Sequence, residues 1–166
     1  MRIVLVPAAP GLLPCAGWID PFAEARSAAL DALRSALASA ESVAVLGAAE
    51  IASSLLEQAG YTGELVSEGA DLVVVAADGS ATRTEKAPGF FDPRSAEFDD
   101  GVETALATGD AAALAQLDES LAAELWCRGV PGFQAMARLL PAPASATVTY
   151  ADAPYGVAYW VASWTD

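Results

Sequence analysis

A short polar stretch between positions 78 and 94 concentrates the groups in this sequence that could do chemistry. Three of the eight basic residues lie there, and Lys86 is the only lysine of the chain. The candidate ligand-binding residues of the stretch are Asp78, Ser80, Arg83, Glu85, Lys86, Asp92 and Arg94. We expect Lys86, with Arg83 or Arg94, to face an anionic ligand. Tyr155, from a later turn, is expected to close one side of the pocket.

The same charges also have a structural interpretation. Cations and carboxylates that alternate along a long loop can pair with one another and hold that loop in place. The pairs would be drawn from Arg83, Lys86 and Arg94 on one side and from Asp78, Glu85 and Asp92 on the other. The sequence leaves both interpretations open.

Any chemistry in this chain must do without histidine, because the sequence contains none. Ser80 therefore has no imidazole to act as its base, and a capping or turn role is favoured. Proton transfer would fall to Lys86, Asp78 or Glu85. It would require burial or a neighbouring charge to bring the pKa of that group toward neutrality.

Short β-branched runs alternate with longer alanine-rich segments, which is typical of an α/β protein with parallel strands. Strands are predicted at 2–6, 42–46 and 71–77, and these three are expected at the centre of the sheet. Helices are predicted over 48–58, from Phe98 to Gly109 and over 131–140. Three more are predicted after the caps Asp20, Asp110 and Asp118, and the first of these has Pro21 in its first position. Asp99, Asp100 and Glu103 are interpreted as a solvated acidic helix face.

The C-terminal part changes to a period of two. Residues 147–150 and 157–164 alternate around a turn at 152–156, which predicts an antiparallel hairpin rich in tyrosine and tryptophan. The predicted fold is a three-layer α/β domain spanning residues 1–166. It has a mainly parallel or mixed central sheet, helices on both faces and a C-terminal antiparallel hairpin.

The charge balance excludes several classes of partner. With 22 acidic and 8 basic side chains, the chain has a formal net charge of −14 and repels polyanions, so neither nucleic acid nor an anionic membrane is expected. No apolar run approaches the roughly 20 residues that span a bilayer. Pro7 and Pro10 interrupt the N-terminal apolar stretch, which favours a buried strand over a signal peptide. Cys15 and Cys127 lie far apart, and reduced thiols in a cytoplasmic protein are expected.

Several motifs resemble a known bacterial family. In the second half of the chain they are Asp78-Gly79-Ser80, Lys86-Ala87-Pro88-Gly89, Asp92-Pro93-Arg94 and Asp152-Ala153-Pro154-Tyr155-Gly156. Residues 6–14 are similar to the first-strand motif of the same superfamily. With these motifs, the chain resembles the class III extradiol ring-cleavage dioxygenases of the B-subunit-like type. The resemblance covers the C-terminal half strongly and implies their α/β fold.

The departures from that family bear directly on chemistry. The resemblance implies non-haem Fe(II) held by two histidines and a carboxylate, with a further histidine for acid–base work. The first-strand motif of active members reads Pro-His-Pro, whereas this chain has Pro7-Ala8-Ala9-Pro10. Active members also carry histidine after the serine of the Asp-Gly-Ser motif, and here that place is Ala81. We therefore expect no metal, no other cofactor and no ring cleavage by the family mechanism.

Three functions remain open at this point. The leading one is a non-catalytic, metal-free domain that keeps the family fold and binds a small molecule or a partner subunit. The second is a metal-independent enzyme in which Lys86, Asp78 or Glu85 transfers a proton on a small anionic or aromatic metabolite. The third is a dimerisation scaffold, a homodimer whose interface is the aromatic C-terminal hairpin.

The excess negative charge makes a prediction about stability. Like charges repel one another in the compact state, and the Debye length falls to about 3 Å at 1 M salt. Added NaCl should therefore raise the melting temperature, measured by differential scanning calorimetry. An unchanged or lower melting temperature would show that the acidic groups are already compensated.

Overall fold

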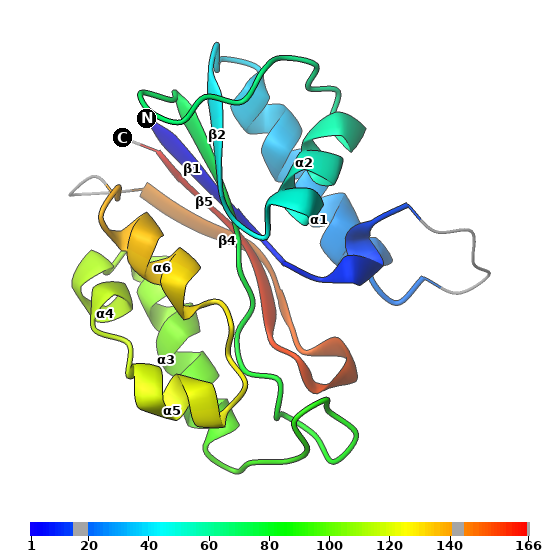
Figure 1. Cartoon of the computed structure of the whole chain (residues 1–166), viewed down its shortest axis with the longest axis vertical. Helices are drawn as coiled ribbons and strands as arrows, with labels where there is room; N and C mark the ends of the chain where they lie inside the picture. Colours follow the sequence, from blue (N-terminus) through cyan, green and yellow to red (C-terminus); the bar gives the residue numbers. More distant parts are fainter. Residues whose placement is uncertain (15–19, 141–144, 166) are drawn as a thin grey trace.

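The computed structural model describes residues 1–14, 20–140 and 145–165, which adopt an α/β fold around a mixed sheet (Figure 1). Within these residues, five strands are arranged in the order β2-β3-β1-β5-β4. They are β1 (Arg2–Val6), β2 (Val43–Gly47), β3 (Leu72–Ala76), β4 (Ser145–Asp152) and β5 (Tyr159–Thr165). β3 pairs in parallel with both β1 and β2, whereas β5 pairs antiparallel with β1 and β4. The predicted C-terminal hairpin is thus confirmed.

The expectation that the three parallel strands form the centre of the sheet is wrong for β2, which lies at one edge. The third central strand is instead β5, which contributes apolar side chains to the core on both faces of the sheet. Val161 packs into the core on one side of the sheet, and Trp160 and Trp164 pack into the core on the other. A strand that is covered on both faces belongs in the interior of a sheet.

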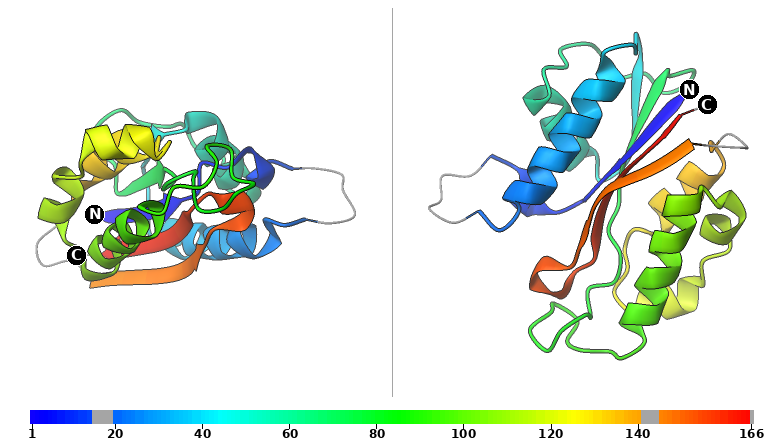
Figure 2. Two further views of the ribbon diagram at one scale, coloured as in Figure 1. Left: turned by 90° about the horizontal axis from the view of Figure 1, so that it is seen from below. Right: turned by 180° about the vertical axis from the view of Figure 1, so that it is seen from behind.

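Helices cover both faces of the sheet and complete three layers (Figure 2). On one face lie α1 (Ala23–Leu37), α2 (Ala49–Gln58) and the short 3-10 helix η1 (Pro10–Leu12). On the other face lie α3 (Ser95–Thr108), α4 (Ala111–Ala115), α5 (Glu119–Glu124) and α6 (Val130–Ala137). A second 3-10 turn, η2 (Pro154–Gly156), closes the hairpin. This arrangement confirms the predicted three-layer architecture.

β1 contributes to the core on each side of the sheet, because successive side chains of a strand point to opposite faces. Ile3 packs in the same cluster as Phe133 of α6. Val4 packs in the same cluster as Leu33 of α1. All four side chains are fully buried. This double burial explains why the first strand of the sequence is an unbroken apolar run.

Local signals fix most of the helix ends. Asp110 accepts a hydrogen bond from the Ala113 N–H at 2.9 Å, and Asp118 accepts one from the Ser120 N–H at 2.9 Å, so both predicted N-caps are confirmed. Gly109 ends α3 in the left-handed conformation, at φ 66°. The predicted cap at Asp20 is wrong: α1 begins at Ala23, and Asp20 forms a turn with Phe22 and an ion pair with Arg26.

No helix in the described part of the chain is long and apolar enough to cross a bilayer. Cys127 is a free, buried thiol. Its predicted packing role agrees with this burial. The other cysteine, Cys15, lies outside the described residues.

Candidate functional site

A crevice opens where the parallel strands end. The chain leaves β1 and β2 toward the layer of α1 and α2, but it leaves β3 toward the layer of α3 to α6. Neighbouring strands whose connections diverge in this way leave a gap at their carboxyl ends. A cavity of about 520 Å³ lies there, and its lining includes Ala8 after β1, Gly47 of β2 and Asp78 after β3.

The turn between α5 and α6 supplies one wall of this crevice. Trp126 and Arg128 line it from that turn, and Tyr159 lines it from β5. Trp126 is about half exposed and has a positive φ of 56°, an uncommon conformation for a bulky residue. Gly129 lets the turn approach the end of β3, because a Cβ at this position would lie 2.0 Å from the Asp78 carbonyl oxygen. The crevice therefore depends on a close contact between two segments that are remote in sequence.

Asp78 is an ionisable group of this crevice whose pKa the fold shifts strongly. Its Oδ1 accepts a hydrogen bond from the Ala8 N–H at 2.6 Å. Burial raises the pKa of this carboxyl to about 7, and the Ala8 hydrogen bond lowers it only in part. Within the part of the chain that the structure describes, no cationic side chain forms an ion pair with Asp78. Asp78 can therefore gain or lose a proton near neutral pH.

The groups around Asp78 stay protonated. Burial, with a contribution from the Asp78 charge, raises the pKa of the Tyr159 hydroxyl. Burial likewise raises the pKa of the Cys127 thiol to about 12. The Cys127 Sγ donates a hydrogen bond to the Asp78 carbonyl oxygen at 3.5 Å. Asp78 is thus the group of this crevice that can exchange a proton in the neutral range.

A buried carboxylate of α3 holds the first part of the polar loop, residues 78–94. Asp99, which is 2% exposed, accepts hydrogen bonds from the Ser80 N–H at 2.9 Å and from the Ser80 hydroxyl at 2.6 Å. Arg83 approaches the same carboxylate at 3.4 Å. The interpretation of Asp99 as part of a solvated face is therefore wrong. A sequence signal for this burial exists, because Asp99 lies three residues before Val102 and seven before Leu106 on the buried face of α3.

Hydroxyl and backbone contacts fix the rest of this segment. The Thr82 and Ser95 hydroxyls are 2.6 Å apart, and both side chains are buried. The Arg83 N–H donates to the Gly156 carbonyl at 3.0 Å, and the Ala158 N–H donates to the Ser80 carbonyl at 2.9 Å. The loop therefore runs against the tip of the C-terminal hairpin, as Figure 1 and the right view of Figure 2 show at the lower end of the molecule.

The remaining predicted residues lie away from the crevice lining. Arg94 pairs with Asp92 at 2.7 Å and with Glu124 of α5 at 2.7 Å, so these charges brace the loop. Glu85 and Lys86 are exposed. The ring of Tyr155 is also exposed, and its centroid lies 6.1 Å from that of Phe22. Of the eight predicted residues, all of which are described, Asp78 is the one that lines the crevice.

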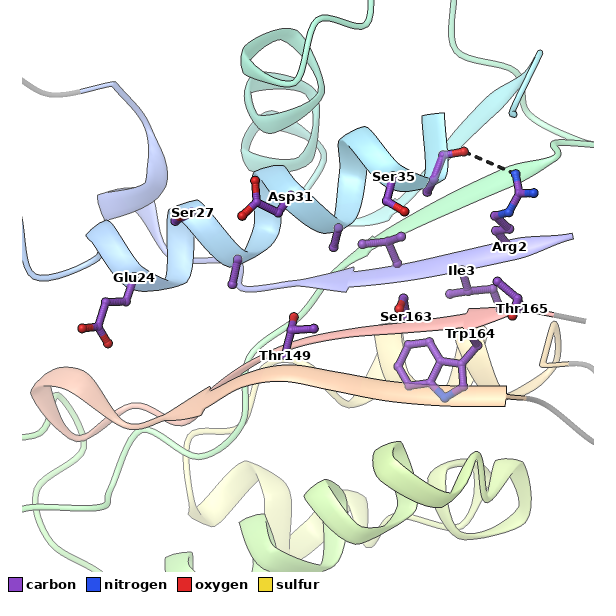
Figure 3. A pocket seen from close by; sticks show the side chains of 14 residues that line it. Arg2, Ile3, Glu24, Ser27, Asp31, Ser35, Thr149, Ser163, Trp164 and Thr165 are labelled. Carbon is purple, nitrogen blue, oxygen red and sulfur yellow. Dashed lines mark hydrogen bonds between the residues drawn. The ribbon is translucent and has the colours of Figure 1, made fainter. Parts of the chain in front are cut away.

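Two other cavities exceed the crevice in volume. A groove of about 570 Å³ between α5 and α6 shares Trp126, Arg128 and Pro131 with the crevice. A separate groove of about 650 Å³ lies between α1 and strands β1, β5 and β4 (Figure 3). The residues that line the groove beside α1 are mainly hydroxyl-bearing and small, and they include none of the eight predicted site residues.

The crevice does not provide the ligands that an extradiol iron requires. Ala81, at the place where the resemblance implies a histidine, lines the crevice, and so does Ala8 of the Pro7-Ala8-Ala9-Pro10 segment. Among the described residues, no group of three His, Cys, Asp or Glu side chains could hold a metal ion. Asp78 alone would leave most positions around Fe(II) without a protein ligand.

A comparison of the sequence with models of known protein families finds no match, and neither does a comparison with curated proteins. The site must therefore be interpreted from its own geometry.

The raised pKa of Asp78 predicts how the Asp78→Asn variant behaves. The unfolded carboxyl titrates near 3.8, whereas the folded carboxyl titrates near 7. Between these values the folded protein binds more protons, so the contribution of Asp78 to the unfolding free energy falls as the pH rises from about 4 to 7. Asn carries no charge. It should raise the unfolding free energy more at pH 8 than at pH 5, by at most about 4 kcal/mol at pH 8.

Urea unfolding at the two pH values measures this difference. Asp100→Asn, at an exposed position of α3, is the matched control and should show no such pH dependence. An Asp78→Asn variant that is equally destabilised at both pH values would contradict the proposed desolvation of the carboxylate.

The contacts of Asp99 with Ser80 and Arg83 predict that Asp99 and its neighbour Asp100 contribute differently to the unfolding free energy. Asp99→Ala leaves Ser80 and Arg83 without their buried acceptor and should lower the unfolding free energy by roughly 2–4 kcal/mol. Asp100→Ala should change it by less than about 0.5 kcal/mol, because that side chain is exposed. Equal effects of the two substitutions in urea unfolding would refute the anchoring role of Asp99.

Proposed function

We propose that this chain is a non-catalytic domain that binds a small aromatic or anionic metabolite in the crevice at the carboxyl ends of β1, β2 and β3. The observation that carries the proposal is Asp78, a largely buried carboxyl with a pKa of about 7 in a cavity of about 520 Å³. Burying an unpaired carboxyl opposes folding. A bound ligand that donates a hydrogen bond to Asp78 can supply the partner that no cationic side chain of the protein provides, and ligand binding therefore explains why the carboxyl is buried.

The chemistry of the lining indicates the class of ligand. Trp126 offers an aromatic face at the wall of the crevice, and Arg128 offers a cation to a carboxylate, phosphate or phenolate. Asp78 can accept a hydrogen bond when it is ionised or donate one when it is protonated. A planar molecule with one acidic group and one hydroxyl or amine would use all three.

The resemblance to class III extradiol ring-cleavage dioxygenases of the B-subunit-like type is part of this proposal. It is supported by the position of Ala8 and Ala81, which both line the crevice although they are remote in sequence. A domain that lost its histidines there would keep the cavity and lose the metal chemistry. The free Cys127 thiol accords with a reducing compartment, and we propose a cytoplasmic location.

A metal-independent enzyme is the second candidate, and the pKa of Asp78 is the observation that favours it. A general base is most effective when its pKa lies near the working pH. Of the three groups that the sequence offers for proton transfer, Asp78 lines the crevice, whereas Glu85 and Lys86 are exposed outside its lining. Asp78 would then remove a proton from the bound molecule.

A thermal-shift screen of small carboxylates, phosphates and phenols tests the binding proposal. A compound that raises the melting temperature of the parent protein should lose most of that shift in Arg128→Ala and in Asp78→Asn. Lys86→Ala removes an exposed cation outside the crevice lining and is the matched control, so it should keep the full shift.

Two results would count against the proposed site. Shifts that survive in Arg128→Ala and vanish in Lys86→Ala would move the binding site to the outer loop. A screen without any shift would remove the support for a small-molecule function. For a compound that binds, proton NMR in D₂O separates the two candidates, because catalytic proton transfer replaces a carbon-bound hydrogen of the compound by deuterium and simple binding does not.

A further inference from the structure

β4 is an edge strand whose outer side is not paired within the described residues. It follows β5 at the end of the sheet order, and its partners in the ladder all belong to β5. The opposite edge is different. Val43 of β2 bridges to Leu65, and its carbonyl accepts the Val66 N–H at 2.9 Å. An unpaired edge strand presents backbone donors and acceptors that can pair with a further strand.

The first part of β4 is electrically neutral in a chain with a formal net charge of −14. From Ser145 to Tyr150 no side chain is charged, and the segment contains none of the lysines or prolines that commonly protect an edge. A second copy of so acidic a chain meets repulsion at charged surfaces but not along this segment. The ladder to β5 is regular from Ser145 to Val148, before a bulge between Val148 and Tyr150.

The segment is also complementary to itself. In an antiparallel pair centred on Thr147, that residue would face its own copy, Ser145 would face Thr149, and Ala146 would face Val148. Hydroxyl side chains would then meet hydroxyl side chains on one face, and apolar side chains would meet apolar ones on the other. Cross-strand pairs of like character of this kind stabilise a sheet. A two-fold axis generates such a pairing directly.

We propose that two copies of this chain associate through antiparallel pairing of their β4 strands, which joins the two sheets into one. Three of the hairpin aromatics, Tyr159, Trp160 and Trp164, cannot form the interface expected of a scaffold, because they are buried in the cores. The backbone of β4, at the outer edge of the same hairpin, forms the interface instead. Since the β2 edge is partly covered, the pairing closes at a dimer and does not continue into a filament.

The pairing also changes the groove between α1 and the sheet. Thr149 lines that groove together with Ser163 and Thr165 of β5 (Figure 3). A two-fold axis perpendicular to the sheet keeps the α1 layers of both copies on the same side. The partner's Ser145 would then lie beside Thr149, and the hydroxyl-lined floor of the groove would continue from one copy to the other.

Sedimentation equilibrium of the full chain tests the association. The parent protein should have about twice the chain mass of 16.9 kDa. Thr147→Lys places two ammonium groups opposite each other at the two-fold axis, and it should shift the protein to a folded monomer, because Thr147 is exposed in one copy. Thr62→Lys adds the same charge at another exposed position and should leave the dimer intact.

Cysteine cross-linking tests the register. Directly opposed residues of antiparallel strands have Cα atoms about 4.5–5.5 Å apart, within the range of a disulfide. Thr147→Cys should therefore form a covalent dimer on mild oxidation. Ser145→Cys should not, since its own copy lies several residues away, and the parent protein controls for the native thiols. A monomeric parent protein, a dimer that survives Thr147→Lys, or equal cross-linking of both cysteine variants would overturn the proposal.

Discussion

The hydrogen bond from the Ala8 N–H to the Asp78 carboxyl joins the two connections that diverge from β1 and β3. Most of what distinguishes the crevice depends on it. The bond joins the segments that follow two adjacent parallel strands, and the carboxyl that accepts it is largely buried. The same burial that raises its pKa to about 7 also makes it the group whose protonation can respond to a ligand near neutral pH.

The polar loop supports this arrangement through most of its charged residues, and it also lines the crevice with Asp78, Gly79, Ala81 and Pro88. Its first residues are fixed by Asp99 through Ser80 and Arg83, and its last residues are fixed by the pairing of Arg94 with Asp92 and Glu124. Basic side chains that brace a loop in this way are satisfied by protein carboxylates. Arg128, which comes from the α5–α6 turn, is the cation that the fold brings to the crevice.

Most parts of this structure that depend on neighbouring residues could be predicted from the sequence, although the predicted cap at Asp20 is wrong. The caps at Asp110 and Asp118, the end of α3 at Gly109 and the apolar first strand all follow from local rules, and all are confirmed. The parts that depend on distant contacts could not be predicted. Nothing local to Trp126 and Arg128 indicates that their turn folds over the end of β3. The central place of β5 likewise follows from helices that pack on both of its faces.

The function proposed for the crevice depends on a desolvated, titratable Asp78, and a direct measurement of the pKa of this carboxyl is its closest test. The ¹³C chemical shift of the Asp78 carboxyl carbon, followed by NMR from pH 3 to pH 9, reports this single group, and Asp78→Asn identifies its signal. A midpoint near 7 is the predicted result. A midpoint near the ordinary aspartate value of about 3.9 would contradict the account, because the carboxyl would then be well solvated or paired in the folded protein.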